Sequence, residues 1–93
     1  MIRAKKGFIL RRLGQEYMVV PVGEAGRDFN GMLRLNETGA FYWREIEKGI
    51  TKEQLIEKML ERYEELDKDI ACKDLEEFLE EIKVALESED EHS

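Results

Sequence analysis

Several residue types are scarce in this 93-residue sequence, and each scarcity excludes a class of protein. A single cysteine, Cys72, cannot form an internal disulfide, which argues against a disulfide-stapled secreted domain and favours the reducing cytoplasm. No run approaches the about 20 consecutive apolar residues that a membrane-spanning helix needs. The basic N-terminus lacks the apolar stretch and cleavage site of a signal peptide. We therefore expect a small cytoplasmic domain with no membrane partner.

The residues that carry most enzyme chemistry are equally rare. His92 is the only histidine, and it lies near the C-terminal end together with both serines, Ser88 and Ser93. Cys72 has no other cysteine and no histidine nearby, so it lacks the spacing of a metal ligand or an activated nucleophile. The seven glycines form no phosphate-binding motif. The sequence therefore predicts no catalytic activity, no metal and no cofactor.

Charged residues are abundant but unevenly distributed. Residues 1–34 hold seven Lys/Arg and three Asp/Glu, a net charge of +4, whereas residues 35–93 hold eight and 19, a net charge of −11. The acidic part predicts solvated helix faces and would repel nucleic-acid phosphates, although a local basic patch could still bind them. A winged-helix nucleic-acid-binding module and an acidic protein-docking module are the alternative functions.

The first third of the sequence predicts three strands. Residues 8–13 and 17–22 are β-rich runs separated by Gly14-Gln15-Glu16, a spacing typical of a hairpin with a three-residue loop. Pro21 lacks an N–H, so it should lie near the end of its strand or at an unpaired position. After an irregular polar connection, residues 31–35 alternate in polarity and predict a third strand.

The remaining sequence predicts three helices, the first two over about residues 37–48 and 52–64. Asn36 and Thr51 are good N-caps for these two helices. Either Asp67 or Asp69 can cap the third helix. Its apolar residues recur with helical spacing and are Ala71, Leu75, Phe78, Leu79, Ile82 and Leu86.

A run of strands followed by a run of helices is typical of an α+β fold, in which helices cover one face of a small antiparallel sheet. We expect one domain over residues 1–86 and an acidic, disordered tail over residues 87–93. A three-stranded meander leaves its third strand at an edge of the sheet. The unpaired N–H and C=O groups of such an edge can bind an extended peptide.

Three consecutive aromatic residues, Phe41, Tyr42 and Trp43, fall on the first helix. Successive helical positions are about 100° apart, so these side chains cannot all face the same side of a core. Two interpretations follow. Either a small core surrounds most of this helix, or Phe41 or Tyr42 reaches the surface of a partner.

The run Leu35-Asn36-Glu37-Thr38-Gly39-Ala40 resembles the LNETGA signature of the PqqD-like family, named for coenzyme PQQ synthesis protein D. Further matches follow in order along the chain, at Ile46, Gly49, Thr51, Leu55, Ile56, Tyr63, Asp74, Phe78, Leu79 and Ile82. The resemblance covers roughly residues 7–86. The sequence departs from the family at its end, where Val84-Ala85-Leu86 runs into acidic residues instead of a glycine and an apolar pair.

The resemblance implies a RiPP recognition element. Such modules bind the leader segment of a ribosomally synthesised precursor peptide and present it to a modifying enzyme, often of the radical SAM type. The family fold resembles a winged helix, with a three-stranded antiparallel sheet followed by a three-helix bundle. The leader would add as a strand beside the third strand. The peptide-binding residues implied are Gly31, Met32, Leu33, Arg34, Leu35, Cys72, Leu75, Phe78, Leu79 and Ile82.

The roles of two parts of this site are open. The apolar residues of the third helix could line a groove or belong only to the core, and Leu75 and Phe78 are the best candidates for both. Arg34 faces away from Leu33 and Leu35, so it either binds an acidic leader residue or is simply solvated.

Overall fold

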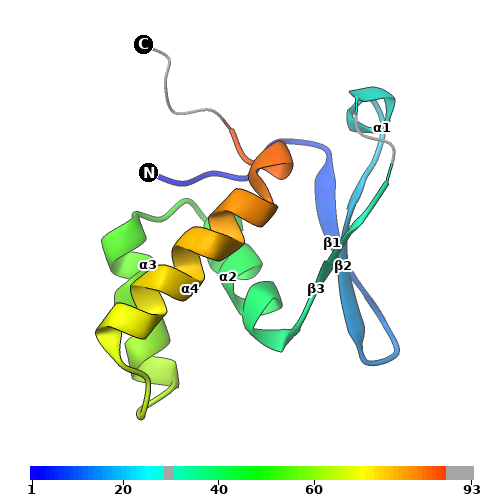
Figure 1. Ribbon diagram of the computed structural model, residues 1–93. Helices are drawn as coiled ribbons and strands as arrows, with labels where there is room; N and C mark the ends of the chain where they lie inside the picture. Colours follow the sequence, from blue (N-terminus) through cyan, green and yellow to red (C-terminus); the bar gives the residue numbers. More distant parts are fainter. Residues whose placement is uncertain (29–30, 88–93) are drawn as a thin grey trace.

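The computed structural model describes residues 1–28 and 31–87. Its elements are β1 (Phe8–Leu13), β2 (Glu16–Pro21), α1 (Ala25–Asp28), β3 (Leu33–Leu35), α2 (Glu37–Glu47), α3 (Lys52–Arg62), α4 (Lys68–Glu81) and the 3₁₀ helix η1 (Lys83–Ala85). The sheet lies on one side of the molecule and α2, α3 and α4 lie on the other (Figure 1). Within the described ranges, the predicted α+β order of three antiparallel strands followed by three helices is confirmed.

The structure adds a short helix before β3 and pairs the start of the predicted tail with the N-terminal segment. The single-turn helix α1 occupies part of the segment predicted to be irregular. Glu87, the first residue of the predicted tail, donates its N–H to the carbonyl of Arg3 at 2.9 Å. The rest of that tail, residues 88–93, lies outside the described residues.

The β1–β2 hairpin has a shorter loop than predicted. Leu13 pairs with Glu16, so the loop contains two residues, Gly14 and Gln15, and the three-residue prediction is wrong. Gly14 has a φ of 63°. A type II′ turn requires this left-handed conformation at its first loop residue, and its twist matches that of the flanking strands. A glycine at this position therefore makes the shorter loop possible.

The hairpin register determines which main-chain groups point outward. A two-residue loop is closed by a hydrogen-bonded pair, here Leu13 and Glu16, and hydrogen-bonded pairs then alternate with non-hydrogen-bonded ones along the ladder. The other end of the hairpin agrees with this alternation, because Val22 donates its N–H to the carbonyl of Gly7 at 2.7 Å. Every second residue of β2 therefore directs its main-chain groups at β1, and the residues between them face β3.

The same alternation continues into β3. Tyr17 and Val19 direct their N–H and C=O groups at β3, where they are paired with Leu35 and Leu33. Arg34 lies between these two paired residues. Because neighbouring residues of a strand direct their main-chain groups to opposite sides, the N–H and C=O of Arg34 point to the open edge of the sheet.

β3 begins at Leu33 and is shorter than the predicted strand over residues 31–35. Pro21 is the next residue of β2 whose main chain faces β3, and in this register it would lie opposite Gly31. Proline has no N–H to donate, so the ladder cannot continue. Pro21 is the last residue of β2, as predicted, whereas Gly31 and Met32 precede the strand.

The core lies between the sheet and the helices, and its fully buried large side chains are Val19, Tyr42, Trp43, Ile46, Leu55, Leu75 and Ile82. Two of the three consecutive aromatic residues, Tyr42 and Trp43, belong to it. Phe41 is half-buried beneath the guanidinium of Arg62, which lies 4.9 Å from the ring centroid. A small core thus surrounds most of α2, which was the first of the two interpretations of these consecutive aromatic residues.

The segment before β1 pairs with two distant parts of the chain. Ile2 forms a bridge with Ile50 in the α2–α3 connection, and Ala4 forms one with Leu86 after η1. No local pattern predicts these pairs, because each joins residues far apart in the sequence. No helix in residues 1–28 or 31–87 has the length and apolarity needed to cross a membrane.

Candidate functional site

The chain turns from β3 into α2 at the residues of the LNETGA signature. Asn36 is the N-cap of α2, and its side-chain oxygen accepts a hydrogen bond from the N–H of Gly39 at 2.8 Å. A Cβ on Gly39 would lie 3.1 Å from Cε1 of Phe78 and 3.2 Å from Cβ of Leu35. Glycine at this position therefore lets α4 pack closely against the junction of β3 and α2.

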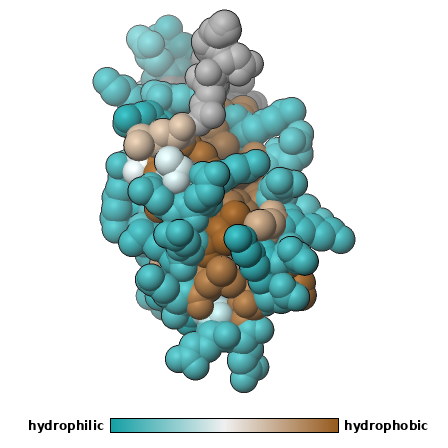
Figure 2. All heavy atoms as spheres, turned by 90° about the vertical axis from the view of Figure 1, so that its left-hand side faces the viewer, coloured by the Kyte–Doolittle hydropathy of each residue, from teal (hydrophilic) through white to brown (hydrophobic). Residues whose placement is uncertain are grey.

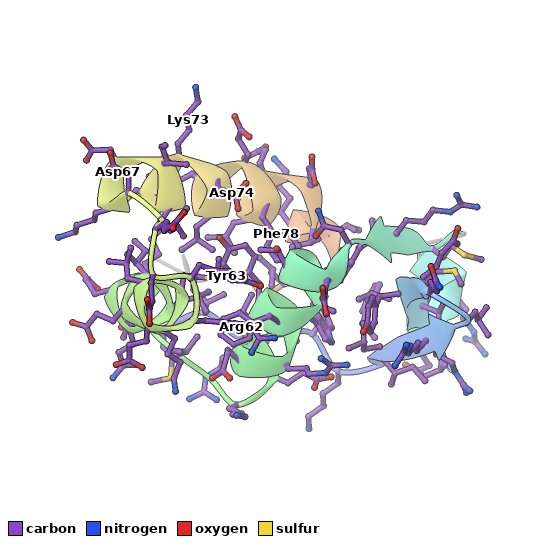
Figure 3. The ribbon with its side chains drawn as sticks, turned by 90° about the horizontal axis from the view of Figure 1, so that it is seen from below. Arg62, Tyr63, Asp67, Lys73, Asp74 and Phe78 are labelled. Atoms are coloured by element: carbon purple, nitrogen blue, oxygen red, sulfur yellow. The ribbon has the colours of Figure 1, made fainter. Side chains whose placement is uncertain are left out.

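A cleft of about 290 Å³ lies beside this junction, at the free edge of β3. It is lined by Arg34, Leu35, Asn36, Thr38, Gly39, Tyr42, Asp74, Glu77, Phe78 and Glu81. Phe78 lies in the space between α4 and α2, whereas Lys73 points away from it (Figure 3). The ring of Phe78 packs on that of Tyr42, with 4.9 Å between the centroids. The strand edge and the face of α4 are thus the two walls of one cleft.

A buried hydroxyl connects α2 to α4 within the cleft. The hydroxyl of Tyr42 donates a hydrogen bond to Oδ2 of Asp74 at 3.0 Å. Burial of the hydroxyl, and secondly this hydrogen bond, raise the pKa of Tyr42 well above its ordinary value. Tyr42 therefore stays a donor throughout the physiological pH range.

The α4 wall of the cleft is acidic. Asp74, Glu77 and Glu81 are three and four residues apart, so they lie on one face of the helix. Among the described residues that line the cleft, Arg34 is the only basic one. No group of three or more side chains in the described ranges has the arrangement needed to hold a metal ion.

A second hollow of about 570 Å³ begins on the other side of Asp74. It is lined by Thr38, Met59, Tyr63, Glu64, Glu65, Leu66, Ile70 and Asp74. Thr38 and Asp74 border both hollows, so the two adjoin, and together they are called the groove below. Ile70 is 59% exposed, which is unusual for a large apolar residue and leaves the far end of the groove partly apolar.

The structure brings only part of the predicted site together. Arg34, Leu35 and Phe78 line the cleft. Leu33, which precedes Arg34, is half-buried. Met32 precedes the strand and is 54% exposed. These residues place the cleft where the sequence predicted peptide binding.

Two other predicted site residues belong to the interior. Leu75 and Ile82 are each 1% exposed, and neither of them lines the cleft or the second hollow. They support the cleft from below by holding α4 against the core.

Leu79 and Cys72 lie on the opposite flank of α4. Leu79 borders a separate cleft of about 440 Å³ beside the N-terminal segment and the start of α3. Cys72 lies one turn before Glu76, whose carboxylate is 3.6 Å from Nζ of Lys52 on α3, so it shares that flank. An apolar strip between polar groups runs down the side of the molecule where α3 and α4 lie (Figure 2).

Sequence reasoning offered Tyr42 only as one of two aromatic residues that could reach a partner, and it did not identify Asp74, Glu77 and Glu81 as cleft residues. A signal for the three acids was present, because their spacing places them together on one flank of the apolar stripe of α4. Nothing in the sequence indicated that this flank would face β3 and not solvent.

Comparisons with known proteins agree with this fold. The family model described as coenzyme PQQ synthesis protein D (PqqD) matches residues 16–85. No curated protein matches the sequence significantly. The chain is similar to a solved structure described as TbiB1 in complex with the TbiA(beta) leader peptide, with a TM-score of 0.75 and 19% identity. The match covers 96% of this chain and 99% of that chain, so the two share their whole fold.

Proposed function

The chain belongs to the PqqD family, and from that membership we propose that it is a RiPP recognition element, which binds the leader segment of a ribosomally synthesised precursor peptide. The observation that supports this function best is the edge of β3. Arg34 directs its main-chain N–H and C=O outward, directly beside the cleft that α4 closes. An extended peptide can satisfy both groups and insert side chains into the cleft.

We expect the leader to lie antiparallel to β3, in a register set by the outward main-chain groups of Arg34. A leader residue opposite Arg34 exchanges two hydrogen bonds with it and directs its own side chain to the outer face of the sheet. The two flanking leader residues direct their side chains to the inner face, toward Phe78 and α4. An acidic leader residue opposite Arg34 would contact the guanidinium, as the sequence suggested.

Of the residues predicted to bind peptide, we place Leu33, Arg34, Leu35 and Phe78 in direct contact with the leader. Met32 is exposed next to this edge and extends the contact by one residue. The remaining five predicted residues support the site, as Leu75 and Ile82 do, or lie away from it.

The protein acts as a binding adaptor and not as an enzyme in this proposal. It would present the leader to a separate peptide-modifying enzyme, of the radical SAM type in related systems. Cys72 is the only cysteine and has no histidine near it in the sequence, which supports a non-catalytic, cytoplasmic role.

Amide chemical-shift mapping and hydrogen exchange test the site. The probes are synthetic peptides that cover the short reading frames beside the gene, titrated into isotope-labelled protein. A binding peptide should shift the amides of residues 32–36 and 74–81 and slow the exchange of the Arg34 amide. The amide of Arg12, which faces the open edge of β1, is the internal control and should keep exchanging. Shifts confined to β1 and α3 would overturn the site.

Nucleic-acid binding is the less favoured alternative. α4 carries six acidic residues and two lysines, so it would repel phosphates where a winged-helix protein places its recognition helix. Titration with duplex DNA at low salt provides the comparison, and no binding is expected.

A further inference from the structure

Carboxylates line one side of the groove, on α4 and on the connection that precedes it. The two hollows are bordered by Glu64, Glu65, Asp74, Glu77 and Glu81, with Arg34 as the only basic residue among the described residues that line them. The groove consists of the two hollows, and these acids determine its charge. A peptide that enters the groove therefore meets a strongly negative wall on the side of α4.

Two pairs of adjacent glutamates on α4 differ in their ion pairs among the described residues. Glu76 contacts Lys52 at 3.6 Å, and Glu80 contacts Lys83 at 3.0 Å. Their neighbours Glu77 and Glu81 border the cleft. Among the described residues, neither of these two neighbours has an ion-pair partner. In each of these two pairs, the glutamate that faces away from the groove has a lysine partner and the one that borders the cleft has none among the described residues.

The shape of the cleft suits a long basic side chain. Phe78 and Leu35 offer apolar surface at the base of the cleft, and the carboxylates of Glu77 and Glu81 lie at its rim, both exposed. Lysine and arginine bury an apolar stem and keep their charged end accessible, so one side chain can contact both parts. A purely apolar side chain would leave the carboxylates unpaired, and an acidic one would be repelled.

We infer that the leader carries lysine or arginine at the two positions that flank the residue opposite Arg34. This inference rests on the proposed function, because only a leader added as a strand to β3 directs these two side chains toward α4. The pattern expected in the ligand is therefore basic, variable, basic. Charge complementarity of this kind selects the correct peptide and speeds its association.

Selection from a peptide library tests the inference without knowledge of the natural leader. A random peptide library displayed on phage is selected against the full chain, against the double variant E77Q/E81Q, and against E57Q/E61Q. Glu57 and Glu61 have the same four-residue spacing and are exposed on α3, outside the groove, so this control removes the same charge. Basic residues at alternate positions should be enriched on the wild type and on E57Q/E61Q, and lost on E77Q/E81Q.

A selected peptide then provides the quantitative comparison. Replacement of its two basic residues by norleucine should weaken binding to the wild type about three- to tenfold and leave binding to E77Q/E81Q unchanged. Affinity for the parent peptide should also fall as salt is added. Amide mapping with the same peptide shows whether it lies on β3.

The possible failures are distinguishable. Selected peptides that map to β3 but lack the basic pattern, or keep it on E77Q/E81Q, would overturn this inference and leave strand addition intact. Failure to select any peptide that shifts residues 32–36 would overturn the proposed function itself.

Discussion

The two edges of the sheet differ in what surrounds them. β1 offers the longer edge, six residues against three in β3, and both edges expose main-chain groups that a peptide could pair with. The edge of β3 borders a cleft closed by α4, whereas none of the three clefts described above contains a residue of β1. Main-chain pairing supplies affinity that depends little on sequence, and side-chain pockets supply selectivity.

The edge of β1 also carries features that discourage pairing. Arg11 and Arg12 are consecutive exposed arginines near its end, whereas β3 has one, Arg34, and charged residues on an edge strand oppose the addition of another strand. The guanidinium of Arg12 lies over the ring of Tyr17, 5.6 Å from its centroid. In the proposed function, the edge of β3 is the binding site because α4 supplies a wall beside it, and the edge of β1 borders none of these clefts.

Proline substitution at each edge should give the largest difference. Arg34→Pro and Arg12→Pro each remove an outward N–H from an exposed arginine and spare the ladder to β2. Arg34→Pro should weaken leader binding about tenfold or more, because a hydrogen-bond acceptor of the peptide is left unpaired. Arg12→Pro should bind normally. Calorimetric titration measures both, with thermal melting to confirm folding, and equal losses in the two variants would refute the assignment to β3.

Substitutions on the two flanks of α4 should affect leader binding differently, because only one flank faces the cleft. Phe78→Leu should lower the free energy of unfolding by about 1–2 kcal/mol, since it removes buried atoms and the contact with Tyr42. It should also weaken leader binding severalfold. Leu79→Ala, on the other flank, should affect stability alone. Denaturant unfolding and titration separate the two effects, and a binding defect in Leu79→Ala would mean that the leader uses the other cleft.

Alanine at two glycines tests the junction of β3 and α2. Gly39→Ala should destabilise the protein by about 1 kcal/mol, because its methyl group would press on Phe78 and Leu35. Gly26→Ala, in α1, has nothing within 4 Å of the new Cβ and should be neutral or slightly stabilising. Chemical denaturation measures both changes. A neutral Gly39→Ala would show that the contact of the new methyl group with Phe78 and Leu35 costs no more than alanine gains in helix propensity.

The smallest effect concerns Tyr42 at high pH. Its pKa is higher in the folded than in the unfolded protein, so the stability it contributes is fully present below the ordinary tyrosine pKa of about 10 and is lost as pH rises above it. Tyr42→Phe cannot titrate. The stability difference between wild type and Tyr42→Phe should therefore narrow by about 1 kcal/mol between pH 9 and 11. A difference that stays constant over this range would contradict the burial argument.

Much of the fold was predictable because its signals are local. The cap of α2 joins Asn36 to Gly39, and Thr51 and Gln54 form a reciprocal capping box at the start of α3. Asp67, one of two candidates, is the N-cap of α4. Interactions that span three or four residues can be predicted from the sequence. The sequence therefore predicts where helices start more accurately than where strands end.

The sequence by itself determined the order of the elements, the helix caps and the family signature, because each depends on neighbouring residues. Tertiary structure alone decided that β3 begins only at Leu33, because this depends on Pro21 lying opposite Gly31. It also decided that Asp74, Glu77 and Glu81 face the edge of β3, while Leu79 and Cys72 face α3. These five α4 residues lie on one regular helix, and only the packing of that helix against the rest of the molecule distinguishes the proposed binding wall from a solvated face.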